Sequence, residues 1–216
     1  AEAYRALRTS IQFISVDREL SIVQFKSSKP GDCKTTSSVN LAVAEARAGQ
    51  NVIIVDCDQR RPRVHELFDH DKKQGYTTAM VGASLDVVAQ TIPDEASLCA
   101  VTSGVVPPDP SELLSTLTAR TFLRSLVPRF DLVIVDTPPV LVVADPLVVS
   151  ASVDAVGMTT IGASGPPAPV ETSRTEAGPI SAGTVRGCQP IRPLPISHSI
   201  SGRSQYLIRC GSRASP

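Results

Sequence analysis

Two runs of consecutive apolar residues stand out in the hydrophobic pattern of the chain. Residues 51–55 (NVIIV) and 131–135 (DLVIV) are apolar at nearly every position, a pattern typical of strands buried on both faces of a parallel sheet. Shorter apolar runs at residues 21–25 and 98–102 predict two further strands. Because these strands alternate with helical segments, we predict an α/β fold with a doubly wound, mostly parallel sheet flanked by helices.

Apolar residues recur with the period of a helix between these strands. This spacing predicts helices over residues 1–14, 34–49 and 110–126, with shorter helices over 85–91 and 145–151. Gly49 marks the end of the second helix, and Pro110 lies near the start of the third. Ligands of such sheets bind at the carboxyl ends of the strands, so the residues that follow the strands are the candidate site.

The charge of the chain changes near residue 156. The 216 residues contain 21 Lys+Arg and 21 Asp+Glu, so bulk charge argues against a nucleic-acid binder. Residues 1–156 hold 15 Lys+Arg and 19 Asp+Glu, a net charge of −4, whereas residues 157–216 hold six Arg and two Glu, a net charge of +4. The second segment is rich in Pro, Gly and Ser. We predict a domain over 1–156, incomplete at its C-terminal end, and an irregular tail over 157–216, disordered or out of frame.

Cysteine spacing and apolar run lengths bear on location. No apolar run reaches the roughly 18 residues that cross a membrane. The five cysteines lack metal-type spacing, which is typical of free thiols in a reducing compartment. We therefore expect a cytoplasmic protein.

Residues 27–36 (SSKPGDCKTT) connect the first predicted strand to the helix that begins at Lys34. A strand, a loop, Lys-Thr and a helix in this order are the context of a P-loop, in which backbone N–H groups bind phosphate oxygens. Lys34 would contact the β- and γ-phosphates of ATP, and the Thr35 hydroxyl would bind Mg²⁺. The expected nucleotide-binding residues are Ser28, Lys29, Pro30, Gly31, Asp32, Cys33, Lys34, Thr35 and Thr36.

Two positions of this loop depart from the pattern GxxxxGK[ST]. Ser28 replaces the first Gly, and Cys33 replaces the Gly before Lys34. The second change matters more, because glycine lets the backbone approach a phosphate without a Cβ in the way. Taken alone, the segment could also be an ordinary turn with a chance Lys-Thr pair.

Acidic residues follow both fully apolar strands. Asp56 and Asp58 come directly after residues 51–55, and Asp136 follows residues 131–135. Asp56 and Asp58 are two positions apart, so they point to the same side of the strand. An acid at the tip of a buried parallel strand facing a P-loop is suited to hold Mg²⁺ or its waters. Each acid alone could be a solvated strand-end residue, but their order after the loop favours one shared site.

At this point the sequence resembles the bacterial tyrosine kinases (BY-kinases) of capsule and exopolysaccharide biosynthesis, within the MinD/ParA-like P-loop ATPases. The resemblance runs from residue 2 to about residue 155, roughly 70% of the chain. It rests on residues 2–8 (EAYRALR), 30–36 (PGDCKTT), 52–62 (VIIVDCDQRRP), 107–114 (PPDPSELL) and 131–139 (DLVIVDTPP).

The resemblance implies an ATP-dependent, autophosphorylating protein-tyrosine kinase with a P-loop NTPase fold. It implies that Lys34 and Thr35 hold ATP and Mg²⁺ and that Asp58 and Asp136 hold the metal or its waters. Asp56 would accept the proton of a tyrosine hydroxyl. The same family resemblance makes Lys34, Asp56 and Asp58 the candidate catalytic residues.

The resemblance also implies partners. Glu2, Arg5 and Arg8 would lie between subunits of a homo-oligomeric ring, although a solvated helix face with ion pairs is the simpler interpretation. A membrane-anchored activator, separate or fused, would place the protein at the inner face of the membrane. Lys29 lies where MinD/ParA-type ATPases carry a lysine that reaches the nucleotide of a neighbouring subunit.

Two family features differ in this chain. The family carries a tyrosine-rich tail, whereas this chain has Tyr4, Tyr76 and Tyr206. The family also continues after residue 155 into a buried strand, which we do not expect here; its loss would leave an inner strand of the sheet without a partner and expose an apolar edge. Two alternatives therefore remain: a MinD/ParA-type ATPase switch without tyrosine transfer, and an inactive remnant.

Overall fold

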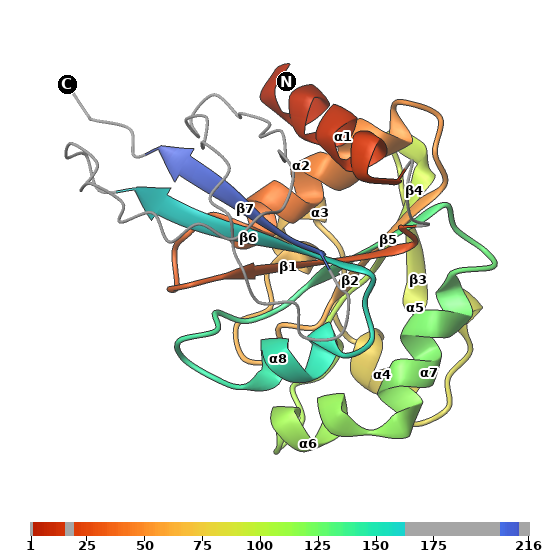
Figure 1. The fold of residues 1–216 in the computed structure, drawn as a ribbon. Helices are drawn as coiled ribbons and strands as arrows, with labels where there is room; N and C mark the ends of the chain where they lie inside the picture. Colours follow the sequence, from red (N-terminus) through yellow and green to blue (C-terminus); the bar gives the residue numbers. More distant parts are fainter. Residues whose placement is uncertain (1, 16–19, 163–203, 212–216) are drawn as a thin grey trace.

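A computed structural model describes residues 2–15, 20–162 and 204–211. Within these residues the chain forms one sheet of seven strands with helices on both faces (Figure 1). The predicted α/β fold is confirmed. The strands are β1 (Ile22–Ser27), β2 (Val52–Asp56), β3 (Ala89–Ile92), β4 (Glu95–Val101), β5 (Leu132–Asp136), β6 (Ala155–Gly162) and β7 (Ser204–Gly211).

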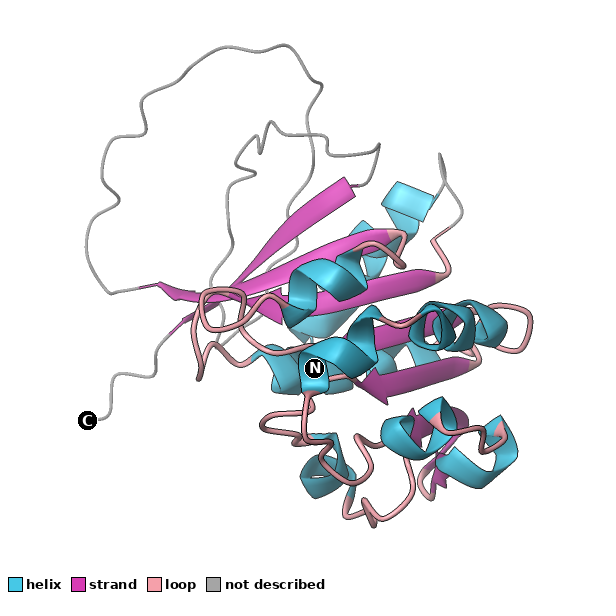
Figure 2. Ribbon diagram, turned by 90° about the horizontal axis from the view of Figure 1, so that it is seen from below, coloured by secondary structure: helices cyan, strands magenta, loops and turns pink. Residues whose placement is uncertain are grey.

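The order of strands across the sheet is β3-β4-β2-β5-β1-β6-β7. Every neighbouring pair is parallel except β3 and β4, which are antiparallel. The helices cover both faces of the sheet: they lie above and below it in Figure 1, and in front of and behind the strands in Figure 2, which is seen from below. They are α1 (Glu2–Ser15), α2 (Lys34–Ala46), α3 (Val64–Phe68), α4 (Tyr76–Met80), α5 (Leu85–Val88), α6 (Pro110–Ser115), α7 (Leu117–Leu126) and α8 (Asp145–Ser150).

The three central strands β1, β2 and β5 are buried along their whole length. Alternate residues of each strand pack on opposite faces of the sheet, as the period of two requires. Ile54 of β2 faces the cluster that includes α1, α2 and α3, whereas its neighbour Ile53 faces the cluster that includes α4, α7 and α8. Both positions must therefore be apolar, which explains the uninterrupted apolar runs in the sequence.

Register brings the carboxyl ends of these strands into one row. Asp56 of β2 pairs with Asp136 of β5, and Phe25 of β1 pairs with the same Asp136. The loop after β1 and the acids that end β2 and β5 therefore meet at one edge of the sheet. This alignment positions the candidate site.

Two predicted helices differ in the structure. The helix predicted over 110–126 is interrupted at Thr116, which has extended backbone (φ −66, ψ 154) and caps α7 by accepting from the N–H of Ala119. The helix predicted over 85–91 ends at Val88, and the chain continues as β3. The short helices α3 and α4 were not predicted, because five residues are too few for a helical period to show.

The first described part of the predicted tail continues a strand. β6 crosses residue 156 and pairs with β1 from Val23↔Ala155 to Ser27↔Thr159, so the expectation that an inner strand lacks its partner is wrong. β7 adds a parallel strand beyond β6. Charge and composition describe side chains, whereas backbone hydrogen bonds hold a strand in a ladder, which is why composition missed β6. Residues 163–203 and 212–216 of the tail lie outside the described residues, and the domain boundary at 156 stays a prediction.

None of the helices in the described ranges combines the length and the apolar content that crossing a lipid bilayer requires.

The cap at Thr116 leads to a stability prediction. Thr116→Ala removes the acceptor for the N–H of Ala119, so we expect the free energy of unfolding to fall by about 1 kcal/mol. Thr118→Ala, at an exposed position inside the same helix, is the matched control and should change it by less than about 0.5 kcal/mol. Urea unfolding followed by circular dichroism measures both. Equal effects of the two substitutions would show that the break between α6 and α7 does not depend on this cap.

Candidate active site

A cavity of about 400 Å³ lies at the carboxyl edge of the sheet. Three segments line it: the loop after β1, the residues after β2 and the residues after β5. Of the predicted nucleotide-binding residues, Ser28 and Lys29 are absent from the lining. The lining comprises Ser27, Pro30, Gly31, Asp32, Cys33, Lys34, Thr35, Thr36, Asp58, Arg60, Arg61, Arg63, Pro138, Pro139 and Val142.

The loop before α2 is held by its own side chains. A carboxylate oxygen of Asp32 accepts from the N–H of Lys29 at 2.9 Å, and the Ser27 hydroxyl donates to the Lys29 carbonyl at 3.0 Å. Gly31 has a φ of +89°, which glycine adopts without steric cost. Lys29 therefore contributes its backbone to the loop.

Cys33 lies in left-handed backbone, with φ 53° and ψ 23°, at the residue that precedes α2. Its side chain makes no capping hydrogen bond, so it satisfies none of the first N–H groups of α2. Uncapped N–H groups at the start of a helix bind anions, and the helix dipole adds to the attraction. Cys33, directly before Lys34, thus replaces glycine at a position whose left-handed backbone favours glycine.

Lys34 is the central charge of the site. Its Nζ lies 2.7 Å from Oδ2 of Asp136 and 3.6 Å from Oδ2 of Asp58. The Thr35 hydroxyl donates to the same Oδ2 of Asp136 at 2.7 Å, and the Ser38 hydroxyl reaches Oδ1 of Asp136 at 3.3 Å. Burial raises the pKa of Asp136, and the charge of Lys34 opposes the rise. The three residues that the sequence assigned to phosphate and metal binding after β1 and β5 are therefore in contact.

Asp56 and Asp58 have different surroundings. Asp58 lines the cavity, whereas Asp56 is completely buried and does not line it. The Asp56 carboxylate accepts from the backbone N–H groups of Asp58, Arg63 and Val64 at 3.0, 3.2 and 3.1 Å. Burial raises the pKa of Asp56 to about 7, the charge of Asp136 adds to the rise, and Lys34 opposes it. These hydrogen bonds to Asp56 thus hold the loop that carries Asp58 in place.

The donor set fits a magnesium ion. The Thr35 hydroxyl and the carboxylates of Asp58 and Asp136 are hard oxygen ligands of the kind Mg²⁺ prefers. No group of three or more His, Cys, Asp and Glu side chains in the described part of the chain is arranged to hold a metal ion. These residues would therefore hold the ion together with water and phosphate oxygens, as Mg²⁺ sites usually do.

A second network, which the sequence did not predict, anchors the segment after β2. Nε of Arg60 donates to Oδ2 of Asp145 at 2.9 Å, and the Ser111 hydroxyl donates to Oδ1 of Asp145 at 2.6 Å. Asp145 is completely buried. The network ties Arg60, two residues after Asp58, to the starts of α6 and α8. In the sequence, Asp145-Pro146 indicates only the start of a helix. The contact with Arg60 joins residues 85 positions apart, so no local pattern predicts it.

The predicted interface residues lie on α1, which packs against α2. Arg5 and Arg8, with Tyr4 and Arg47, line a cavity of about 260 Å³ between these helices. Arg8 is half-buried, so α1 does not present it on a fully solvated face. The side chain of Glu2 lies outside the described residues.

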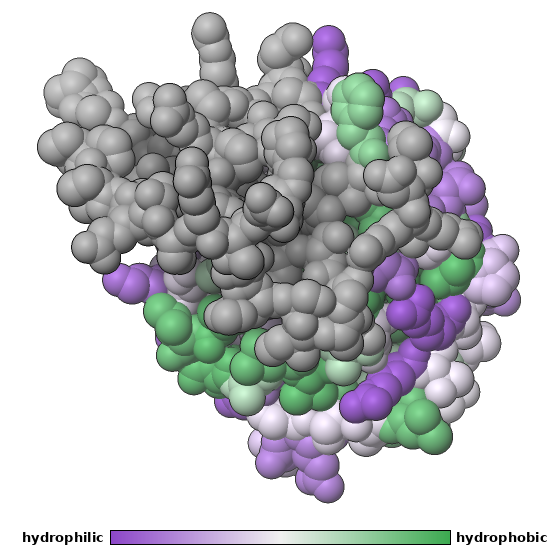
Figure 3. Space-filling view, in the orientation of Figure 1, coloured by the Kyte–Doolittle hydropathy of each residue, from purple (hydrophilic) through white to green (hydrophobic). Residues whose placement is uncertain are grey.

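Three exposed apolar side chains lie on the loop after β5 and on α8. Leu141, Val142 and Leu147 are largely exposed, at 70%, 58% and 60%. Green side chains gather at the lower left of Figure 3, over the segment that contains α8 and the loop before it. Of these three residues, Val142 lines the cavity, so the cavity has an apolar neighbour at that position.

The sequence of this chain is similar to sequences of known proteins. The profile of the AAA domain family matches residues 20–156. Tyrosine-protein kinase YwqD of Bacillus subtilis is 40% identical over 145 residues, which cover 67% of this chain and 61% of YwqD. The chain thus spans about three-fifths of the length of that relative.

Solved structures show the same likeness. The kinase domain of the Escherichia coli tyrosine kinase ETK has a TM-score of 0.71 and 37% identity, covering 74% of this chain and 63% of that one. The VpsO kinase domain has a TM-score of 0.66 and 31% identity, covering 74% and 78%. MinD from Pyrococcus horikoshii, in complex with Mg-ADP, shares the fold alone, with a TM-score of 0.56 and 22% identity over 65% of this chain and 58% of that one. The fold is thus one in which nucleotide and Mg²⁺ are bound.

The backbone at Cys33 leads to a second stability prediction. Cys33→Gly should raise the free energy of unfolding by about 1 kcal/mol, because left-handed backbone costs glycine nothing. It should also tighten nucleotide binding, since no Cβ then faces the phosphates. Cys33→Ala is the matched control, because it removes the thiol and keeps the Cβ. Thermal unfolding and ATP titration measure both variants, and a gain shared by Cys33→Ala would show that the thiol, not the backbone, is responsible.

Proposed function

The chain belongs to the bacterial tyrosine kinase family, and on that premise we propose that it transfers the γ-phosphoryl group of ATP to tyrosine hydroxyls. The observation that carries the proposal is the position of Lys34, buried at the cavity floor and bonded to Asp136 beside Asp58 and Thr35. The cavity, the uncapped start of α2 and this cluster together supply what phosphoryl transfer requires: positioning and neutralisation of charge.

In the proposed reaction the tyrosine oxygen attacks the γ-phosphorus, and the bond from that phosphorus to the bridging oxygen of ATP breaks to leave ADP. Lys34 exchanges its contact with Asp136 for the β- and γ-phosphates, because its flexible side chain ends in a single mobile charge. Magnesium, when bound, neutralises charge on the phosphates, and Thr35, Asp58 and Asp136 would hold it. The hydroxyl proton passes to an aspartate after β2.

Asp56 remains the proposed acceptor of that proton, in keeping with the family resemblance. Its pKa of about 7 suits a base that works near neutral pH. In the structure described here its oxygens accept three backbone N–H groups, so a tyrosine would reach it only after the segment 57–64 moves. Asp58, which already lines the cavity, is the second candidate.

Burial limits which tyrosines can accept phosphate. Tyr76 is completely buried, and burial raises the pKa of its hydroxyl far above the usual range. Tyr4 is half-buried on α1. The side chain of Tyr206 lies outside the described residues. Tyrosines of other molecules, including other copies of this chain, are therefore part of the proposal.

The proposed setting follows the family. Copies of the chain would form a ring through the face of α1 that carries Glu2, Arg5 and Arg8. A membrane-anchored activator, separate or fused, would hold the ring at the inner face of the membrane in capsular or exopolysaccharide biosynthesis. The exposed apolar residues Leu141, Val142 and Leu147, of which Val142 lines the cavity, support a partner on this surface, since exposed apolar clusters mark interaction sites.

The first functional prediction concerns Lys34. Lys34→Ala should abolish phosphotyrosine formation and weaken ATP binding at least about tenfold, because the cavity loses its central positive charge. Lys72→Ala, at an exposed lysine that does not line the cavity, should retain both activities. Phosphotyrosine immunoblotting and calorimetry measure the two effects.

Other outcomes of this experiment identify the alternatives. An unchanged phosphotyrosine signal in Lys34→Ala would contradict the proposal. Phosphate release from ATP without phosphotyrosine in the unmodified protein would identify an ATPase switch of the MinD/ParA type. Failure of the unmodified protein to bind ATP would identify an inactive remnant.

The second functional prediction separates the two acids after β2. Asp56→Asn should slow tyrosine phosphorylation by about 10²–10⁴-fold, the usual contribution of a general base, with little change in Mg-ATP affinity. Asp58→Asn should weaken Mg-ATP binding itself. Single-turnover phosphorylation and calorimetry distinguish the variants, with thermal unfolding as the check that each folds. Full transfer by Asp56→Asn would assign the proton to Asp58.

A further inference from the structure

A second cavity, of about 370 Å³, lies at the opposite edge of the sheet from the phosphate loop. Its lining residues precede the strands: Leu20 precedes β1, Gln50 precedes β2, and Asp131 precedes β5. Helix α2 connects the two edges, since it begins at Lys34 in the first cavity and its last turn contributes Glu45 to the second. This amino-edge cavity is therefore separate from the candidate active site.

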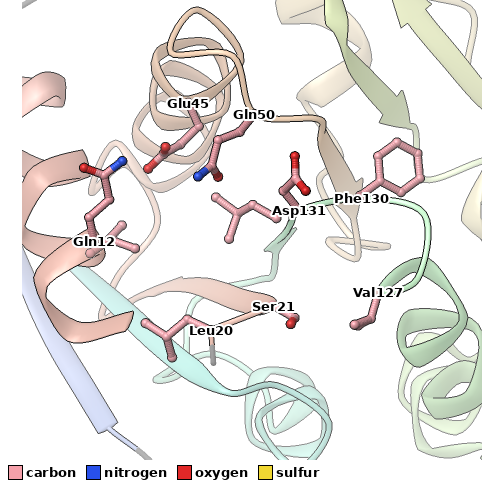
Figure 4. Close-up of a pocket in the computed structure, with 10 residues that line it drawn as sticks. Gln12, Leu20, Ser21, Glu45, Gln50, Val127, Phe130 and Asp131 are labelled. Carbon is pink, nitrogen blue, oxygen red and sulfur yellow. The ribbon is translucent and has the colours of Figure 1, made fainter. Parts of the chain in front are cut away.

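Glu45 is the unusual group in this cavity. Its side chain is almost completely buried, at 1% exposure, and its Oε2 has no hydrogen-bond partner among the residues that the structure describes. Figure 4 shows Glu45 and Gln50 on one side of the space and Gln12 across from them. Leaving a buried carboxylate oxygen unpaired is unfavourable, and more so when the group is charged. Such a group in a native protein therefore needs an explanation, and a bound ligand is one.

The charge around Glu45 favours a cation as that partner. Asp131 places a second carboxylate on the cavity wall. The last turn of α2 also ends here, and the carbonyl end of a helix carries partial negative charge. From α1, Arg8 is close enough for its charge to act on Glu45, but no ion pair or hydrogen bond joins the two in the described structure. Nε of Arg8 is itself buried without a partner there.

Part of the remaining wall is apolar, beside the polar residues Gln12 and Ser21. Leu20, Phe130 and Val127 lie on the side of the cavity away from Glu45 and Gln50 (Figure 4). A bare metal ion would gain nothing from these side chains, whereas the methylene groups of an organic cation would be removed from water against them. The volume lies within the usual range for a small-molecule site.

We propose that the amino-edge cavity binds an alkylammonium group, with Glu45 as the paired carboxylate and Asp131 as the supporting charge. The group can come from a free small amine or from a lysine side chain of another polypeptide, because both present the same ammonium on an apolar stem. The proposal is independent of the kinase proposal, since the cavity shares no lining residue with the active site.

The test is calorimetric titration of the full chain with n-butylammonium, without nucleotide. A saturable signal with a dissociation constant of about 1 mM is expected for a ligand of this size. Glu45→Gln should weaken binding at least about tenfold, and Asp131→Asn by less. Glu66→Gln, an exposed acid on α3, is the matched control and should bind as the unmodified chain does. Equal binding by Glu45→Gln, or no saturable binding by the unmodified chain, would overturn the proposal.

Two further ligands test whether binding depends on the charge of the ligand and whether the ammonium group belongs to a free amine or to a polypeptide. Neutral n-butanol should not bind, and equal binding of n-butanol would show a merely apolar cavity. Nα-acetyl-lysine methylamide presents the ammonium as a polypeptide would. Preference for it would identify a protein partner, whereas preference for n-butylammonium would identify a free amine.

The pH dependence supplies a signature that a structural role would not. Burial raises the pKa of Glu45 to about 7, against the opposing charge of Arg8. Protonation removes the charge that pairs with the ammonium, so affinity should fall as the pH is lowered from about 8 to about 6. The folded protein holds this proton to a higher pH than the unfolded chain does, so the contribution of Glu45 to stability is lost as the pH rises from the ordinary pKa of a glutamate through about 7. Glu45→Gln should therefore be at least as stable as the unmodified chain at about pH 8. Thermal unfolding at this pH checks that the variant folds.

Discussion

The contact between Lys34 and Asp136 is the interaction on which the rest of the site depends. The two groups lie 2.7 Å apart, and both side chains are nearly or completely buried. A buried charge without a partner is strongly unfavourable, so each holds the other in place. Lys34 begins the helix after the phosphate loop, and Asp136 ends the strand beside β1 and β2. Their pairing therefore fixes the loop to the sheet and leaves a lysine ready to exchange a carboxylate for a phosphate.

The three aspartates differ in the groups that they contact. Asp136 holds Lys34 and Thr35, Asp58 lines the cavity, and Asp56 is enclosed by backbone N–H groups. Their similar positions after parallel strands bring them together, but the direction in which each carboxylate turns decides what it can reach. The Arg60–Asp145–Ser111 network then fixes the segment that carries Asp58. Phosphoryl transfer relies on charges that are fixed in place in this way.

Helix α2 places groups of opposite charge at the two edges of the sheet: Lys34 at its start and Glu45 in its last turn. The start of α2 presents uncapped N–H groups and Lys34 to an anion, and the last turn of α2 presents Glu45 to a cavity with a second carboxylate. The helix dipole favours an anion at the first end and a cation at the second. The physical asymmetry of one helix thus supports two separate binding proposals.

The sequence by itself determined the α/β class, the central strands, the helix after the phosphate loop and the family, because apolar period and motif spacing are local properties. It also placed Lys34, Thr35 and Asp136 at one edge, since parallel strands align their carboxyl ends. Only the tertiary structure decided that Asp56 turns inward and that Asp145 binds Arg60. The same holds for β6, which pairs with β1 despite an unusual composition, and for the unpaired burial of Glu45. Each of these depends on contacts between residues far apart in the chain, and such contacts leave no periodic signal.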